Sequence, residues 1–155
     1  MRADLDWNAT TPLRDEVKDA MRQAMEISGN PSSVHTEGRA AKMALEAARE
    51  QVAVALGAEG ADVIFTSGTT EAAAMVLAGK HVHCAPVEHS AIKAWCEQDL
   101  AVDHDGIVTV TDPASSTLQI ANNESGVMQA LPAGLASSDL TQAFGKVPFA
   151  FNWLD

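Results

Sequence analysis

A short apolar run that ends in a Ser-Gly turn and continues into an alanine-rich run constrains the fold of this chain more than any other feature. Residues 63–65 (Val-Ile-Phe) are β-branched and aromatic and predict a buried strand, and residues 71–77 predict a helix. The turn at residues 66–70 leaves backbone N–H and hydroxyl groups at the start of that helix. Because the helix dipole adds positive potential there, the turn predicts an anion cradle, most simply for a phosphate group.

The composition of this turn limits which phosphate compound it can hold. No lysine lies in it, although the phosphate-binding loop of nucleoside triphosphatases requires one. The same residues also fit an ordinary strand-to-helix turn in which a threonine caps the helix. The turn alone leaves both interpretations open.

Length, charge and cysteine content narrow the class of protein. A chain of 155 residues with 46% hydrophobic residues is typical of one globular domain, here residues 1–155. The net charge of −11 argues against nucleic acid or an anionic membrane as a main partner. Two cysteines, Cys84 and Cys96, form no disulfide framework, and no apolar run approaches the length of a membrane span. The sequence therefore predicts a cytoplasmic protein.

Predicted helices and strands alternate along the chain. Helices are expected at residues 11–27, where Thr11 can cap and Pro12 suits the first position, at a long segment that Gly57 ends, at 71–77 and at 91–98. Strands are expected at residues 63–65, 80–85, 107–111 and 117–121. This alternation predicts an α/β fold, a three-layer architecture in which helices flank a mostly parallel sheet.

The expected sheet places three candidate groups together. The cradle, His89 and Asn122 each follow a predicted strand, and ligands of such sheets bind at the carboxyl ends of the strands. We therefore expect these groups to converge on one edge. The sequence closes with a polar turn at residues 137–139 and an apolar tail that includes Phe149, Phe151 and Trp153.

Six segments in a fixed order resemble one known family. They are residues 8–12 (Asn-Ala-Thr-Thr-Pro), 29–35 (Gly-Asn-Pro-Ser-Ser-Val-His), 65–71 (Phe-Thr-Ser-Gly-Thr-Thr-Glu), 87–90 (Val-Glu-His-Ser), 121–127 (Ala-Asn-Asn-Glu-Ser-Gly-Val) and 139–146 (Asp-Leu-Thr-Gln-Ala-Phe-Gly-Lys). Together they resemble the cysteine desulfurases, class V aminotransferases among the fold-type I pyridoxal-phosphate enzymes. The resemblance covers nearly the whole chain and corresponds to the N-terminal part of the family's large domain.

The resemblance implies pyridoxal 5′-phosphate as the cofactor and gives roles to its two ends. Thr69 and Thr70 would hold the phosphate through amide and hydroxyl groups, in agreement with the cradle. Asp139 would pair with the ring nitrogen, and its negative charge would keep that nitrogen protonated so that the ring can act as an electron sink.

Three further positions match residues around the ring in the family. His89 would stack on the pyridine ring and relay protons at the substrate, which makes it the candidate catalytic residue. Asn122 would lie beside the phenolic oxygen, and Gln142 would donate a hydrogen bond to that oxygen.

Each of these residues also has a structural interpretation. Asp139-x-x-Gln142 fits a helix capping box, and His89 directly precedes a predicted helix and can cap it. Asn122 is a common turn residue, because asparagine tolerates left-handed backbone angles. Residues 29–35 can form a loop without a functional role, although the resemblance places them near the active site.

A metal site is a separate alternative in the segment from His81 to Cys84, with His89 nearby. His81 and His83 would share one face of a strand while Cys84 faces the other way, which disperses the ligands. The sequence therefore predicts no metal site there. Cys84 and Cys96 are expected to be small buried hydrophobes, and neither matches the sulfur-accepting cysteine of the family.

Part of the family pattern is not found in these residues. The family attaches its cofactor to a lysine in a Ser-x-His-Lys motif, as a Schiff base, and none of the five lysines here follows such a pattern. The intervals between motifs are short, and residues 133–138 are small and polar where an apolar strand is expected. We therefore expect a partial domain, inactive alone, that forms a homo-oligomer, needs a complementing C-terminal polypeptide or is poorly soluble.

The functional hypothesis follows the resemblance. The family reaction takes sulfur from L-cysteine to give L-alanine and an enzyme persulfide, in homodimeric enzymes of iron–sulfur cluster assembly. The expected substrate is a cysteine-like amino acid, with no nucleic acid and no membrane as partner. Open alternatives are one half of a split enzyme, a non-catalytic binding or scaffold remnant, and another class V enzyme such as a selenocysteine lyase.

Overall fold

The fold has two compact units, which are described separately. The computed structural model describes residues 3, 5–148 and 151, and its first unit is Met1–Ile64 and its second Phe65–Asp155. The single-domain organisation expected from the sequence stays a prediction. No helix in the described part of the chain is long and apolar enough to cross a membrane.

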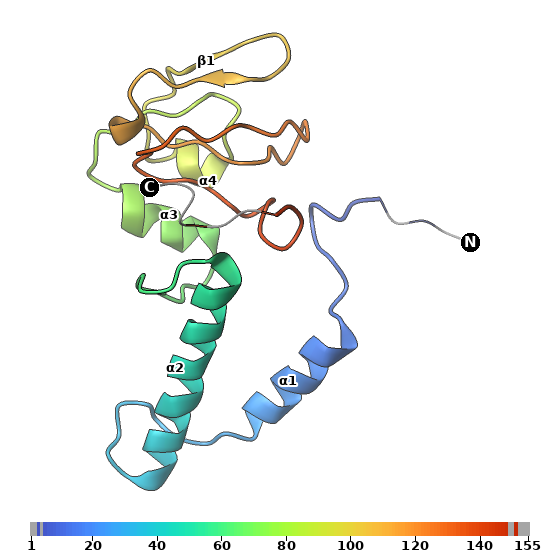
Figure 1. The fold of residues 1–155 in the computed structure, drawn as a ribbon, viewed down its shortest axis with the longest axis vertical. Coiled ribbons are helices and arrows are strands. Elements are labelled where there is room, and N and C mark those ends of the chain that lie inside the picture. The colour runs from blue at the N-terminus through green and yellow to red at the C-terminus, as the bar shows by residue number, and fades with distance from the viewer. Residues whose placement is uncertain (1–2, 4, 149–150, 152–155) are drawn as a thin grey trace. The chain divides into compact units, whose positions relative to one another are not determined.

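The first unit contains two helices, α1 (Asp15–Met25) and α2 (Thr36–Leu56), joined by a loop (Figure 1). The first helix is shorter than the predicted 11–27, because Arg14 rather than Thr11 takes the N-cap position and no side chain caps it. Asp15 and Glu16 nevertheless complement the helix dipole in the first turn. None of the residues of α1 is buried.

The helix α2 confirms its sequence prediction. Its apolar face is buried or half-buried, at Ala41, Ala44, Leu45, Ala48, Val52 and Leu56. His35 caps its start by accepting a hydrogen bond from the Gly38 N–H, and Gly57 ends it at φ +62°. Glycine is suited to that left-handed conformation, which terminates many helices.

The loop before α2 approaches the helix too closely for side chains at two glycines. A Cβ atom on Gly29 would lie 2.4 Å from the carbonyl oxygen of Glu37, and one on Gly38 would lie 2.4 Å from that of Ser33. Both contacts are with backbone, which cannot move aside as a flexible side chain could. The loop at residues 29–33 is therefore packed against the start of α2 through its glycines.

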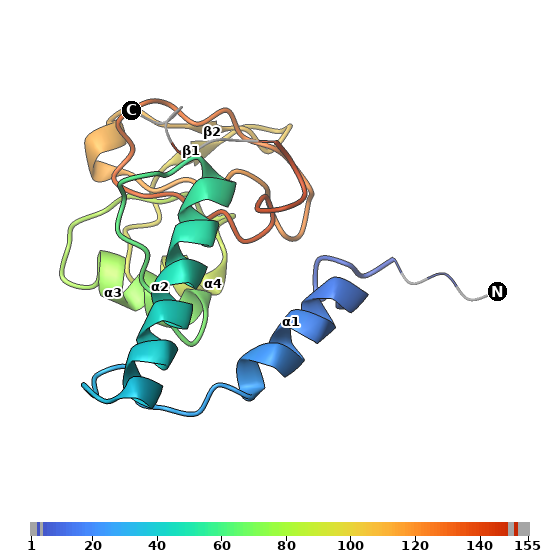
Figure 2. The same cartoon turned by 60° about the horizontal axis from the view of Figure 1, so that its bottom comes forward.

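The second unit holds the remaining elements. The helices α3 (Thr69–Leu77) and α4 (Ser90–Lys93) lie side by side, as Figures 1 and 2 show. The strands β1 (Ala101–Val102) and β2 (Val108–Thr109) form an antiparallel pair, and the 3₁₀ turn η1 spans Pro113–Ser115. The helix α3 confirms the prediction at 71–77, whereas α4 is shorter than the predicted 91–98.

The mostly parallel sheet expected from the sequence is not formed as a continuous ladder. Among the described residues the only sheet has two strands, β1 and β2, and they are antiparallel. Parallel pairing survives as isolated bridges, from His83 to Glu97 and Ser116 and from Thr117 to Ser137. The hydroxyl of Ser138 donates to the Leu118 carbonyl (2.6 Å), so a polar side chain takes an acceptor that a longer ladder would use.

The predicted buried strand at residues 63–65 is wrong. These residues form no strand, and the side chains of Ile64 and Phe65 are 66% and 49% exposed. No described strand or β-bridge includes these residues, so their β-branched and aromatic composition does not by itself produce a strand. In the predicted tail, Phe149 and Trp153 lie outside the described residues, and Phe151 is exposed.

Two apolar clusters form the core of the second unit. The first contains Ala73, Leu77, Val82, Cys84 and Ile92, with Cys96 packed against it. The second contains Ala85, Leu100, Val108 and Leu118, with Val102, Val110, Leu131 and Leu135 at its border. The segment at residues 82–85 contributes to both clusters, so it is central to this unit.

We expect Gly38→Ala to lower the free energy of unfolding by roughly 1–3 kcal/mol, because the new methyl group overlaps the Ser33 carbonyl. Urea unfolding followed by circular dichroism measures the change. Gly68→Ala is the matched control, since a Cβ there meets open space and the backbone is extended. Equal destabilisation by both substitutions would contradict the close approach at Gly38.

Candidate functional site

The start of α3 retains the features of the predicted cradle. Gly68 takes the N-cap position in an extended conformation and makes no side-chain cap, so the threonine-cap interpretation does not describe this turn. The first amide with a partner inside the helix is that of Ala72, which donates to the Gly68 carbonyl. The amides of the first turn therefore point out of the helix, beside the hydroxyls of half-buried Thr69 and exposed Thr70.

A carboxylate that sequence reasoning missed lies at this turn. Oε2 of Glu71 accepts hydrogen bonds from the N–H (2.7 Å) and the hydroxyl (2.5 Å) of Ser67. These bonds hold the pKa of Glu71 below its usual value, which keeps the carboxylate charged. The cradle is thus limited to the amides of the first helical turn and the threonine hydroxyls, with a negative charge next to them.

A hydrogen bond joins the cradle to the segment that carries Asp139 and Gln142. The hydroxyl oxygens of Thr69 and Thr141 are 3.0 Å apart, although the two residues are far apart in sequence. Asp139 accepts from the Thr141 N–H through Oδ1 (2.9 Å), and its carbonyl accepts from the Ile120 N–H (3.3 Å). The structure therefore brings Thr69 and the Asp139 segment together.

The Asp139-x-x-Gln142 segment forms a series of turns rather than the start of a helix. Asp139 accepts from a backbone amide two residues later, as a capping residue would. Gln142, however, accepts through Oε1 from Nζ of Lys146. Asp139 therefore accepts a backbone hydrogen bond as a capping residue does, but the segment is not the start of a helix.

His89 caps α4, as its structural interpretation proposes. Its side chain is exposed, and Nδ1 accepts a hydrogen bond from the Ala91 N–H (3.2 Å). Because Nδ1 acts as an acceptor, a neutral ring carries its proton on Nε2.

Asn122 is both a turn residue and a link to the segment before His89. Its Oδ1 accepts from the amides of Glu124 (2.9 Å) and Ser125 (2.8 Å), which closes the turn. Its Nδ2 donates to the carbonyl of Val87 (2.7 Å). Asn122 is buried, so these bonds fix the ends of two segments next to each other.

Glu88, beside His89, is a buried acid that sequence reasoning also missed. It is 3% exposed, and its Oε1 accepts from the Gln119 N–H (2.8 Å). Its Oε2 has no hydrogen-bond partner among the described residues. The pKa of Glu88 is raised to about 7, mainly by burial and also by the nearby charge of Asp139, while the Gln119 bond and the charge of Lys93 oppose the increase.

These contacts bring the candidate residues together in two groups. Thr69 lies at the Asp139–Gln142 segment through Thr141, and Asn122 lies at the His89 segment through Val87. The Ile120–Asp139 bond connects the groups, since Ile120 is two residues before Asn122. No hydrogen bond of the described residues joins the His89 ring to Asp139. That these residues bind a cofactor stays a prediction.

Substitution of Glu88 tests the buried acid. An acid whose folded pKa exceeds its unfolded value of 4.5 binds more protons in the folded state, so stability falls as pH rises from about 4.5 to about 7. Glu88→Gln imitates the neutral acid. We expect it to change little at pH 4.5 and to raise the free energy of unfolding at pH 8 by roughly 1–3 kcal/mol.

Urea unfolding at a series of pH values measures this effect. Glu59→Gln, at an exposed position, is the control and keeps the pH dependence of the parent chain. An unchanged or larger pH dependence in Glu88→Gln would mean that Glu88 is charged in the folded protein.

Comparison with known proteins identifies the family. The family model described as aminotransferase class-V matches residues 4–133. The cysteine desulfurase IscS of Dictyoglomus turgidum is 38% identical over 152 residues, covering 81% of this chain and 39% of that protein. The selenocysteine lyase of Bos taurus is 33% identical over 207 residues, covering 92% of this chain and 47% of that protein.

Solved structures show the same relationship. The NifS-like protein of Rickettsia africae matches with a TM-score of 0.82 and 29% identity, over 97% of this chain and 51% of that one. A second NifS-like protein matches with a TM-score of 0.83 and 28% identity, over 100% of this chain and 53% of that one. The chain path is therefore that of a NifS-like protein, although the described residues form little sheet.

The chain spans about half the length of the relatives that it matches, and it is also shorter within the matched region. The alignment with the bovine lyase extends over 207 positions but takes in 92% of a 155-residue chain. The relative therefore has residues between the shared segments that this chain lacks, in line with the short intervals between its motifs. This chain belongs to the class-V aminotransferase family, and within it is related to the cysteine desulfurases and selenocysteine lyases.

Proposed function

We propose that this chain provides the phosphate-binding and ring-binding part of a pyridoxal-phosphate site that acts on the carbon–sulfur bond of a cysteine-like amino acid. The observation that carries the proposal is the hydrogen bond between Thr69 and Thr141 (3.0 Å). It holds the start of α3, suited to a phosphate, beside the carboxylate of Asp139, suited to a protonated ring nitrogen.

The residues present fit the two ends of the cofactor. Amides and hydroxyls at Thr69 and Thr70 are the donors that a phosphate dianion accepts where cations are scarce. One oxygen of Asp139 is used by Thr141, and the other accepts no hydrogen bond from the described residues. That oxygen is available to a ring N–H.

The cofactor, when bound, supplies an electron sink for bond cleavage at the amino-acid carbon. The residues of this chain bind and orient it. Asp139 would hold a proton on the ring nitrogen. Because Oε1 of Gln142 accepts from Lys146, the amide nitrogen of Gln142 is the end that would donate to the phenolic oxygen. His89 presents Nε2 for proton exchange because Nδ1 is used as a cap, and Asn122 fixes its turn against the Val87 carbonyl.

In this proposal, two chemical groups needed for the full reaction are supplied by residues other than those of this chain. None of the lysines lies in a Ser-x-His-Lys motif, and Lys93 and Lys146 donate to Pro86 and Gln142. Cys84 is buried, and burial raises the pKa of its thiol to about 12, which opposes a sulfur-accepting thiolate. A complementing polypeptide that carries a Ser-x-His-Lys segment would supply the attaching lysine and the acceptor cysteine.

A non-catalytic scaffold is the second candidate function. The observation in its favour is the carboxylate of Glu71, which occupies the amide of Ser67 and places a negative charge beside the cradle. Such a charge opposes a phosphate dianion. The similarity to selenocysteine lyases leaves selenium as an alternative to sulfur in the substrate.

Cofactor binding by the chain alone distinguishes these functions. We expect weak, reversible binding of pyridoxal phosphate, measured by equilibrium dialysis, and at least about tenfold weaker binding by Asp139→Asn, which corresponds to about 1.4 kcal/mol. Asparagine keeps the oxygen that accepts from Thr141, so the local fold is retained. Asp105→Asn, on an exposed turn, is the control and keeps the affinity of the parent.

Covalent attachment and turnover provide the opposing outcomes. Borohydride reduction followed by intact-mass measurement should show no stoichiometric adduct, and L-cysteine should release no sulfide with the chain alone. Sulfide release after addition of a polypeptide with a Ser-x-His-Lys segment supports a shared site. No cofactor binding, or binding that Asp139→Asn leaves unchanged, would leave the scaffold as the function.

A further inference from the structure

Two neighbouring segments of the second unit run parallel and bring metal-binding side chains to one surface. The Glu97 N–H donates to the Val82 carbonyl (2.9 Å), and the Cys84 N–H donates to the Glu97 carbonyl (2.8 Å). The Leu100 N–H then donates to the Cys84 carbonyl (3.2 Å). These bonds set residues 82–84 and 97–100 side by side in a fixed register.

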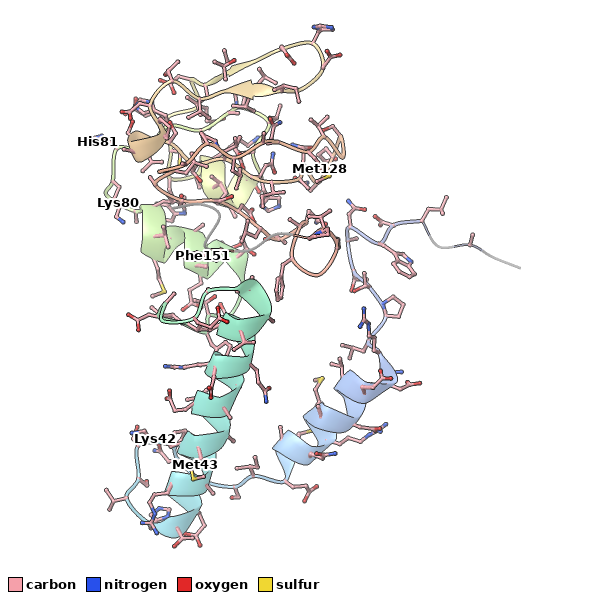
Figure 3. All side chains as sticks on the ribbon, viewed as in Figure 1. Lys42, Met43, Lys80, His81, Met128 and Phe151 are labelled. Carbon is pink, nitrogen blue, oxygen red and sulfur yellow. The ribbon has the colours of Figure 1, made fainter. Side chains whose placement is uncertain are left out.

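Alternation along the first segment separates its apolar and polar side chains. Val82 and Cys84 are buried in the first core cluster, so His81 and His83 belong to the opposite, outer face. His81 is 96% exposed, and Figure 3 shows its side chain projecting at the surface. His83 is half-buried, which restricts the ring more than full exposure would.

The second segment places two carboxylates against these imidazoles. Nδ1 of His83 lies 2.9 Å from both carboxylate oxygens of Asp99. Nδ1 of His81 lies 3.8 Å from Oε1 of Glu97. Ligand atoms of His83, Glu97 and Asp99 all lie within 4.8 Å of one another.

We propose that His81, His83, Glu97 and Asp99 form a binding site for a divalent transition-metal ion of the zinc class. Two imidazole nitrogens and two carboxylate oxygens suit such an ion, which tetrahedral protein sites bind at about 2.0–2.2 Å from each ligand atom. Ligand atoms in that geometry are about 3.3 Å apart. The separations of 2.9 Å between His83 and Asp99 and of 3.8 Å between His81 and Glu97 lie on either side of this value, so side-chain rotations would bring these pairs to the required spacing.

The register of the backbone distinguishes this site from a chance group of charges. Each pair of ligands is spaced by two residues, which places both members of a pair on one face of an extended segment. The other group with ligand-type side chains, Asp103, His104 and Asp105, comes from consecutive residues of a single exposed turn. No second segment of the described residues contributes a ligand to it, so it provides an internal control.

The proposed site differs from the set of ligands considered in the sequence. The sequence offers His81, His83, Cys84 and His89 as neighbours, and Cys84 is buried in the core while His89 caps α4. Glu97 and Asp99 replace them as ligands because parallel pairing brings a segment more than ten residues away alongside. The spacing of residues in the sequence does not reveal this pairing, which arises only in the fold.

Zinc binding to the full chain tests the proposal. Titration against a chromogenic zinc chelator at pH 8 should show one ion bound per chain. The alkaline pH is chosen because the hydrogen bond to Asp99 raises the pKa of His83, and protons compete with metal for the ring. We expect His81→Ala and Asp99→Asn each to weaken zinc binding at least about tenfold, since each removes or neutralises a ligand.

The controls separate the site from other causes. His81 and Asp99 are exposed, so both variants should fold, and circular dichroism verifies this. His104→Ala should bind zinc as the parent does, and zinc should raise the melting temperature of the parent and of this control but not of His81→Ala. The absence of saturable binding by the parent, or equal weakening by His104→Ala, would overturn the proposal.

Discussion

The backbone pairing of residues 82–85 is the interaction on which the rest of the second unit depends. His83 donates to the Ser115 carbonyl on one side and accepts from Thr117, while Cys84 bonds Glu97 on the other side. These bonds satisfy polar groups that would otherwise be costly to bury. They also let Val82, Cys84 and Ala85 enter the two core clusters. The carboxyl end of the segment leads directly to Glu88 and His89, so the same pairing positions the candidate site.

The parts of the fold that sequence predicts well are those specified by neighbouring residues. The helix α2 has a regular apolar face and a glycine at its end, and both signals are local. The sheet depends on strand pairing between residues distant in sequence, and residues 63–65 take part in no described strand or β-bridge. Residues with strand-forming composition therefore form a strand only where a second segment lies alongside and pairs with them.

The contacts of the candidate site also divide into those that the sequence predicts and those that it does not. Parallel strands bring their carboxyl ends together, so the proximity of the Asn122 and His89 segments follows from the order of predicted elements. Glu71 has a local signal that was available, since it lies four residues after Ser67 and can reach back to it. The contact between Thr69 and Thr141 has no such signal, because it joins residues from opposite ends of the unit.

The distribution of negative charge around the site gives Glu88 a role in its electrostatics. Glu71 is held in its charged form by Ser67, whereas burial raises the pKa of Glu88 to about 7. Near neutral pH a large part of Glu88 is thus uncharged, and the repulsion between it and Asp139 is correspondingly reduced. A charged Asp139 is what a protonated pyridine nitrogen requires. A neutral Glu88 next to Asp139 leaves one carboxylate for the pyridine ring. The unpaired oxygen of Glu88 is therefore compatible with the function proposed for Asp139 and His89.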